Sequence, residues 1–299
     1  MADQTSLEGV PKDAQRRLRE MRGGDGKKGL FTSDLSAPEL LLVQQAGFDP
    51  LAQVLGASLY RVGWTNALTN KGGGLYRAAD LPTLRASSHV IENRRLTRSL
   101  TGARRRAVQR LQLQAQAVKA DGVVGARLKI RDWAEGLAEF AILGTAVRRQ
   151  GVRSRYRHPF TSSLSGQDTA RLLSGGYVPL NLVMGASAQQ AMMNRTDALW
   201  SHREIGSYSR ALNQAQSSAN RRMAREASEL GASGVVGVTF TSKIAEYEAG
   251  SSWVLGRIVE WVMVGTAVGS LPASQAAATP KLVMPLRPRR KMDGGSNVP

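Results

Sequence analysis

Two long stretches of the chain repeat the same pattern of apolar and polar positions. In each, a short capped helix is followed by a strand, a long amphipathic helix and two more strands. The apolar stripe of the first long helix consists of Val108, Leu111, Ala115 and Val118. After that helix, the apolar residues Val124, Ala126, Leu128 and Ile130 alternate with Arg127, Lys129 and Arg131, which predicts a half-buried strand.

Short blocks of identical sequence accompany this repeated pattern. They are FTS (31–33 and 160–162), GAS (56–58 and 185–187), GVVG (122–125 and 234–237) and GTAV (144–147 and 265–268). The blocks keep their order, and the distance between partners is 129, 112 or 121 residues. These distances place extra residues after GAS in the first copy and in the last hairpin of the second copy. The chain is therefore a tandem duplication.

The fold class predicted from this pattern is α+β. We expect two tandem β-α-β-β repeats, each a small antiparallel sheet covered by a long helix. The expected segments are a flexible N-terminal arm (1–30), repeat 1 (31–150), a basic linker (151–158), repeat 2 (159–270) and a disordered tail rich in Pro, Ala and basic residues (271–299).

The last strand of each copy is apolar on both faces. These strands are EFAILGTAV (139–147) and EWVMVGTAV (260–268). One helix hides only one face of a small sheet, so the other face needs a second cover. The short capped helix, the other repeat or a second chain could supply it. We expect a homo-oligomer, and we expect Val262→Glu to dissociate it if the outer face is the interface.

The composition gives little support for catalysis. The chain has no cysteine and three histidines, which excludes disulfides, thiolate metal sites and a cysteine nucleophile. It also lacks a G-x-S-x-G elbow and a phosphate loop ending in Gly-Lys-Ser/Thr. We therefore expect no catalytic residues, no cofactor and no enzymatic activity. The repeated glycines suit close backbone approach, with Gly122 and Gly234 expected at positive φ where a helix ends.

The net charge of +18 is distributed unevenly between the copies. Residues 31–158 carry 20 basic and 9 acidic side chains, whereas residues 159–270 carry 9 and 8. Clustered arginines suit phosphate groups, so an anion-binding surface is one interpretation and a solvated basic face is the other. The candidate anion-binding residues are Arg104, Arg105, Arg106, Arg127, Arg131, Arg148 and Arg149. We expect Arg104 to Arg106 at the start of the first long helix.

The glycine-spaced blocks resemble the YbjQ family. The resemblance is carried by ELGASGVVGVTFTS in the second copy and by GASLYRVGW and AVKADGVVGARLKI in the first. It implies a β-α-β-β fold and assembly into rings, which are pentamers in the simple form of the family. Members are often labelled as heavy-metal-binding. Here His89, His158 and His202 lie far apart in sequence, so metal binding is disfavoured and no metal ligand is assigned.

Together these observations predict a non-enzymatic scaffold or binding protein that forms a ring-like homo-oligomer. The alternatives are binding of a polyanion, either nucleic acid or an anionic membrane, through the basic first repeat, and metal binding. The start of the chain lacks an apolar leader and no segment is a plausible membrane span, so we expect a cytoplasmic location. The apolar and basic residues 283–291 could be a peptide ligand for a protein partner.

Overall fold

The protein is described by a computed structural model over residues 13–17, 32–61, 90–133, 137–151, 158–192, 206–249 and 254–270. The first half contains α2 (Ala37–Gln45), β1 (Phe48–Arg61), β2 (Val90–Glu92), α3 (Arg94–Ala117), β3 (Gly122–Trp133) and β4 (Leu137–Arg149). The second half contains β5 (Phe160–Thr161), α4 (Gly166–Ser174), β6 (Tyr177–Met192), α6 (Gly206–Glu229), β7 (Gly234–Ala249) and β8 (Val254–Ser270). This confirms the α+β class and the repeated strand-helix-strand-strand order.

The described strands form two four-stranded sheets, and each sheet includes one short strand that comes from the other repeat. Sheet A has the order β1-β4-β3-β5, and sheet B has the order β2-β6-β8-β7. β5, from the second repeat, pairs in parallel with β3 of sheet A. β2, from the first repeat, pairs antiparallel with β6 of sheet B. The other pairings are antiparallel, as the sequence predicts.

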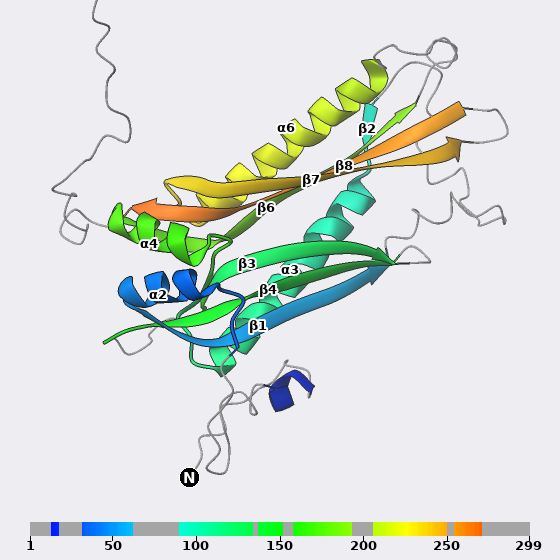
Figure 1. Cartoon of the computed structure of the whole chain (residues 1–299). Helices are drawn as coiled ribbons and strands as arrows, with labels where there is room; N and C mark the ends of the chain where they lie inside the picture. The colour runs from blue at the N-terminus through cyan, green and yellow to red at the C-terminus, as the bar shows by residue number, and fades with distance from the viewer. Residues whose placement is uncertain are drawn as a thin grey trace, which may run out of the picture.

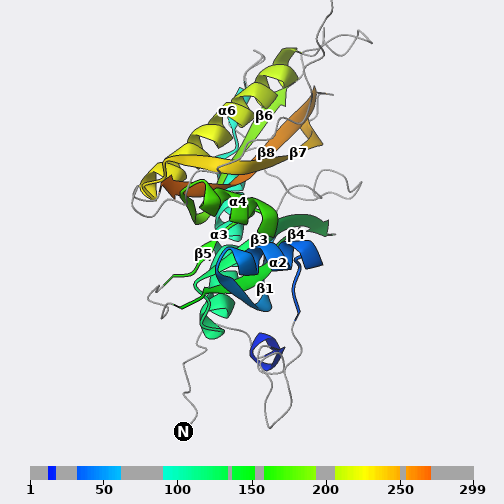
Figure 2. The same ribbon diagram turned by 60° about the vertical axis from the view of Figure 1, so that its left-hand side comes forward.

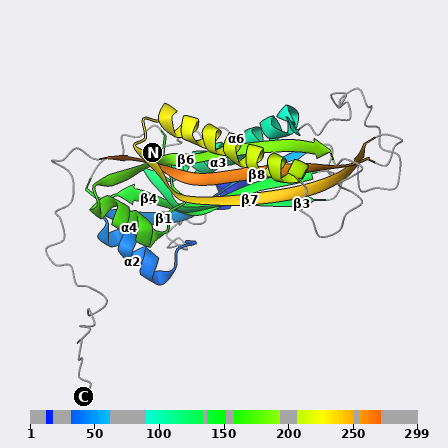
Figure 3. The same ribbon diagram turned by 90° about the horizontal axis from the view of Figure 1, so that it is seen from above.

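The sheets lie one above the other, and the two long helices occupy different positions (Figure 1). α6 covers the face of sheet B that points away from sheet A, as Figures 2 and 3 show. α3 starts beside β2 at sheet B and runs along sheet A, so it contacts both β1 and β6. One repeat's helix therefore covers its own sheet and part of the other.

Each long helix packs on its own sheet through the same closely spaced contacts. A Cβ atom added to Gly56 would lie 1.9 Å from the carbonyl oxygen of Ala107 in α3. One added to Gly185 would lie 1.8 Å from the carbonyl oxygen of Ala219 in α6. Neither position has room for a side chain. The close-approach interpretation of the GAS blocks is confirmed.

The two short helices pack against each other at one end of the sheets. Both have a serine N-cap, as predicted: Ser36 pairs with Glu39 in a capping box, and Ser165 accepts a hydrogen bond from the backbone N–H of Asp168. Beneath α2, the residues Val43, Phe48, Val124 and Val147 form a small separate core. These short helices cover one end of the outer face of sheet A.

Two local predictions are wrong. α3 begins at Arg94, where the Asn93 side chain accepts from the N–H of Leu96, so Arg104 to Arg106 lie in the middle of the helix rather than at its start. In the GVVG block the second glycine, Gly125, has the positive φ of 65°. It lies at a register shift between β3 and β4, where an extra residue must be accommodated.

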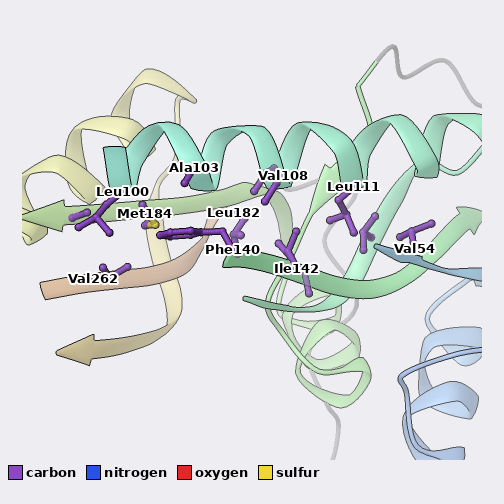
Figure 4. Close-up of a cluster of buried hydrophobic side chains, with 14 of the residues drawn as sticks. Val54, Leu100, Ala103, Val108, Leu111, Phe140, Ile142, Leu182, Met184 and Val262 are labelled. Carbon is purple, nitrogen blue, oxygen red and sulfur yellow. The ribbon is translucent and has the colours of Figure 1, made fainter. Parts of the chain in front are cut away.

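The main hydrophobic core is continuous across the two repeats. It joins α3 to Phe140 and Ile142 of β4, and to Met184 of β6 and Val262 of β8 (Figure 4). The sequence suggested three possible covers for the second apolar face of β8: the short helix, the other repeat or a second chain. The structure shows that the other repeat covers this face. Val262 is 5% exposed inside the chain, so the expectation that Val262→Glu would act on an outer interface is wrong.

Candidate functional site

The N-terminal half of α3 and the strand before it attach the first repeat to sheet B. The backbone N–H of Asn93 donates to the carbonyl of Ala188, at 2.8 Å. The N–H of Ala188 in turn donates to the Thr97 hydroxyl, at 3.1 Å. Glu92 pairs with Arg222 of α6 at 2.6 Å. Backbone, hydroxyl and ionic contacts thus combine at this junction, which we call the inter-repeat junction.

A partly buried ion pair belongs to the inter-repeat junction. Arg104 of α3 is 5% exposed, and its Nη2 lies 2.6 Å from Oε1 of Glu226 in α6. Glu226 also accepts a hydrogen bond from the backbone N–H of Met184, at 2.9 Å. Removing Glu226 would leave the buried Arg104 guanidinium without a partner, which is costly in a protein interior, whereas Glu226 itself is partly exposed. The pair therefore fixes how the two repeats are joined.

The first copy keeps the hydrogen bond from the strand to the long helix, but it has no ion pair at this position. Gln114 occupies the place of Glu226 and accepts from the N–H of Leu55, at 3.0 Å. Its second partner is Arg17, at 2.8 Å. At the shift of 112 residues, the counterpart of Arg104 is Gln216. The copies therefore differ at two paired positions: Arg104 corresponds to Gln216, and Glu226 corresponds to Gln114. This paired difference could have indicated the ion pair from the sequence.

A cleft of about 650 Å³ opens beside the ion pair, between α3 and α6. Its wall carries six arginines and three glutamates, which are Arg94, Arg98, Arg104, Arg105, Arg222, Arg225, Glu92, Glu226 and Glu229. Two of these, Arg104 and Arg105, are among the anion-binding candidates named from the sequence. The residues of α6 are not, because nothing in a linear pattern shows which surfaces of the two helices meet.

The predicted anion-binding arginines do not form one patch. Their environments differ, and three are tied to neighbours: Arg104 to Glu226, Arg127 to Asp34 at 3.7 Å, and Arg148 to two carbonyls at the end of α3. Arg106 lies over the ring of Tyr60, at 5.9 Å from its centroid. Arg105, Arg131 and Arg149 are exposed on α3, β3 and the end of β4. Only the pair 104–105 reaches the cleft.

The outer face of sheet A, turned away from α3, is open along much of its length. Register places Leu55, Ala57 and Leu59 of β1 opposite Leu143, Ala141 and Glu139 of β4. Arg127, Lys129 and Arg131 of β3 follow on the same face. Leu59 is 59% exposed, and the described residues provide no cover for this part of the sheet. We call it the open face.

A second apolar surface is exposed on the far side of the molecule. α6 covers β6 and β8 more fully than the edge strand β7. On β7, Val238, Phe240 and Ile244 are 42%, 61% and 56% exposed. Phe240 stacks on Trp261 with ring centroids 4.6 Å apart. We call α6 and this part of β7 the α6 face.

The described residues do not fit a metal site. No three His, Asp or Glu side chains within the described ranges gather in a way that could hold an ion. Of the three histidines, only His158 lies within the described ranges, and it belongs to no such group; His89 and His202 lie outside those ranges. Among the helices that the structure describes, none is long and apolar enough to cross a membrane.

The fold defines a class: a duplicated α+β protein whose first long helix is shared by both sheets. Residues 89–150 and 161–270 match the YbjQ_1 family, described as "Putative heavy-metal-binding", and the chain belongs to this family. A curated protein of Mycobacterium tuberculosis (strain ATCC 25618 / H37Rv) is named "Encapsulin nanocompartment protein Rv1762c". It is 36% identical over 266 aligned residues, and the similarity covers 86% of this chain and 92% of the relative. Neither description is that of an enzyme.

Proposed function

We propose that the protein is a non-enzymatic scaffold whose chains associate head to tail into a ring. The observation that carries the proposal is the pairing of surfaces inside the chain. The side of sheet B that points toward sheet A is covered by α3, and the equivalent side of sheet A is the open face. In the same way, α3 is covered on two sides, whereas the equivalent helix α6 is covered on one.

These two unpaired surfaces are equivalent to surfaces that already fit each other. Met184, Ala186 and Ala188 of sheet B, which contact α3, are 4%, 1% and 0% exposed. At the shift of 129 residues their counterparts are Leu55, Ala57 and Leu59 on the open face. The α6 face of one chain would therefore pack on the open face of the next as α3 packs on sheet B. Such a contact is heterologous, and it closes into a ring when the rotation permits.

The apolar side chains on both surfaces favour association of chains over a monomer that leaves them in water. Both surfaces carry large exposed apolar side chains, Leu59 on one and Phe240 on the other. Exposed apolar groups of this size on neighbouring strands are typical of association sites. The family resemblance adds the expectation of five chains in the ring.

The mycobacterial relative supports a role in a nanocompartment. Its printed name assigns it to an encapsulin nanocompartment, and its similarity extends over most of both chains. We propose that this protein is also a component of such a compartment, present in the cytoplasm. The tail at 271–299 lies outside the described residues, and its role as a peptide ligand stays a prediction.

Assembly is tested by light scattering and by two complementary variants. Leu59→Glu damages the open face, and Phe240→Glu damages the α6 face; each alone should give a monomer at micromolar concentration. Mixed together, the two variants should form a dimer, because one chain of each kind keeps the intact half of a single interface. Leu41→Glu is the matched control, since Leu41 is 58% exposed on α2, outside both surfaces, and should leave assembly unchanged. A monomeric wild type, or a mixture that stays monomeric, contradicts the proposal.

The nanocompartment role is tested separately by co-expression with an encapsulin shell protein. The full chain should sediment with the assembled shell. A chain ending at Ser270 should lose this association if the tail is the ligand, with its own assembly unchanged. A full chain that stays in the soluble fraction would contradict the nanocompartment role and leave the ring proposal to stand on its own test.

Polyanion binding by the first repeat is the second candidate function. It is favoured by the basic row Arg127, Lys129 and Arg131, which lies on one face of β3. The row shares the open face with the proposed chain-to-chain contact. The double variant Arg127→Gln with Arg131→Gln should therefore bind duplex DNA or anionic vesicles more weakly than the wild type. The affinity of the wild type should also fall more steeply with rising salt concentration.

A further inference from the structure

The cleft between α3 and α6 contains more positive charge than the fold uses. Within it, Arg104 and Arg222 are paired with Glu226 and Glu92. The remaining cations are Arg94, Arg98, Arg105 and Arg225. These four are exposed, and none makes an ion pair or hydrogen bond with a residue that the structure describes. Glu229 is the remaining acid on the wall.

Comparison with the other copy indicates that three of these four arginines are not required by the shared fold. At the shift of 112 residues, Arg94 corresponds to Gly206 and Arg105 to Ser217. Arg225 of the second copy corresponds to Leu113 of the first. Only Arg98 has a basic counterpart, Arg210. Both copies keep the same fold with different side chains here, so the charge of the cleft has another cause.

The arrangement of these cations is unfavourable in an empty cleft. Arg94 and Arg98 are four residues apart on α3, where like charges repel. They also lie in the first two turns, at the positive end of the helix dipole. Arg225 approaches from α6 and adds a third repelling charge. An anion between the helices would remove all of these penalties.

The lining side chains indicate which anion fits. Guanidinium groups present paired N–H donors that match the oxygens of phosphate. Thr97 and Thr101 also line this wall, but their hydroxyls donate to Glu92 and to the carbonyl of Thr97, which leaves the arginines as the donors for a ligand. None of the described lining residues is aromatic, so the cleft offers no platform on which a nucleobase could stack. Its volume, about 650 Å³, is in the range of small-molecule sites.

We propose that this cleft binds a small ligand carrying two or more linked phosphate groups. Arg94, Arg98 and Arg105 approach the phosphates from α3, and Arg225 approaches from α6. Because the ligand would contact both helices, it would also stabilise the inter-repeat junction. This proposal does not depend on the ring, since every residue of the site belongs to one chain.

The test is titration calorimetry on the full chain with inorganic triphosphate, orthophosphate and ATP. Triphosphate should bind saturably, about tenfold more tightly than orthophosphate, and with an affinity similar to that of ATP. ATP binding that greatly exceeds that of triphosphate would point to recognition of the base and overturn the proposal. Failure of triphosphate to bind at about 50 mM salt would also overturn it.

Matched variants separate the cleft from general surface charge. Arg98→Gln with Arg105→Gln should weaken triphosphate binding at least about tenfold. Arg127→Gln with Arg131→Gln removes the same charge from the open face and should weaken it less than about threefold. Equal losses in the two double variants would show nonspecific attraction and overturn the proposal. If the first double variant fails to fold, Arg225→Gln on α6 provides the same test, with a smaller loss expected.

Duplex DNA is the competing ligand. A duplex that binds more tightly than triphosphate, and that is weakened equally by both double variants, would identify a general basic surface instead of the cleft. At the same concentration, triphosphate should also raise the melting temperature of the wild type more than that of the Arg98/Arg105 variant.

Discussion

The two sheets face different environments although they descend from one sequence. In sheet B, strands β6 and β8 are covered on both faces, by α6 outside and by α3 and the first repeat inside, while the edge strand β7 is largely exposed. Sheet A is covered by α3 on one face, and on the other face by α2 and α4 at one end only. The comparison teaches that a doubly apolar strand does not by itself identify a surface for another chain. In β8 the second face is satisfied within the chain, whereas in β4 it stays half-buried.

The greatest loss of stability is expected when a glutamate is introduced in sheet B, compared with the same change at the equivalent position of sheet A. Val262 of β8 and Ala141 of β4 are equivalent at the shift of 121 residues. Val262→Glu places an unpaired carboxylate against α3 and should lower the free energy of unfolding by about 4 kcal/mol or more. Ala141→Glu places the same group on the open face and should change it by less than about 1 kcal/mol, while weakening assembly.

Denaturant unfolding combined with light scattering distinguishes these outcomes. Equal destabilisation by the two substitutions would mean that the open face is covered within the chain, and would remove the contrast between the sheets.

A smaller effect is expected from the partly buried ion pair at the inter-repeat junction. Glu226→Gln should lower the free energy of unfolding by about 2 kcal/mol, because it leaves the buried charge of Arg104 without its partner. Arg104→Gln should cost about 1 kcal/mol, because the Glu226 carboxylate is partly exposed and keeps its hydrogen bond from the Met184 N–H. The double variant should recover much of that loss, since it recreates the neutral side chains of the other copy, Gln216 and Gln114.

The measurement is a double-mutant cycle from denaturant unfolding, with an expected coupling of about 2 kcal/mol. Arg105→Gln, next in the chain and exposed, is the control and should be nearly neutral. Additive single losses would show that the charges act independently.

The smallest effect concerns the cap of α2, which covers the end of sheet A. The Ser36 side chain and backbone N–H both hydrogen-bond to the Glu39 carboxylate, and they hold the pKa of Glu39 below its usual value of 4.5. A lowered folded-state pKa means that this contribution is present above the unfolded-state pKa. It is lost as the pH falls through the lower folded-state pKa.

Glu39→Gln should therefore cost about 0.5 to 1 kcal/mol at neutral pH. The difference from the wild type should shrink in acid, below pH 4.5, where the carboxylate becomes protonated. Thermal unfolding at neutral and acid pH measures this difference. A difference that grows in acid would contradict the assigned cause.

Much of the fold could be predicted from the sequence because its signals are periodic. The alternation in β3 and the stripe in α3 span many residues, and the repeated blocks confirm each assignment in the other copy. The exchanged strands could not be predicted. β2 has three residues and β5 has two, which is too short for any alternation to be recognised.

The cleft was only partly predictable for a different reason. Arg104 and Arg105 are neighbours in sequence, yet one is buried against Glu226 and the other is exposed in the cleft. Charge counts show that a segment is basic, but the partner of each charge depends on how the helices meet. The paired difference between the copies, Arg104 with Gln216 and Glu226 with Gln114, was the available signal.

The exchange of short strands has a consequence for synthesis on the ribosome. α3 ends at Ala117, but sheet B, which covers Leu96 and Leu100, is complete only at Ser270. At roughly 5 to 20 residues per second, the apolar start of α3 waits on the order of 10 to 30 seconds for its partner. During that interval the nascent first repeat exposes apolar surface that the finished chain buries. We therefore expect the first repeat to complete its folding only after the second repeat has been synthesised, because the two share one core.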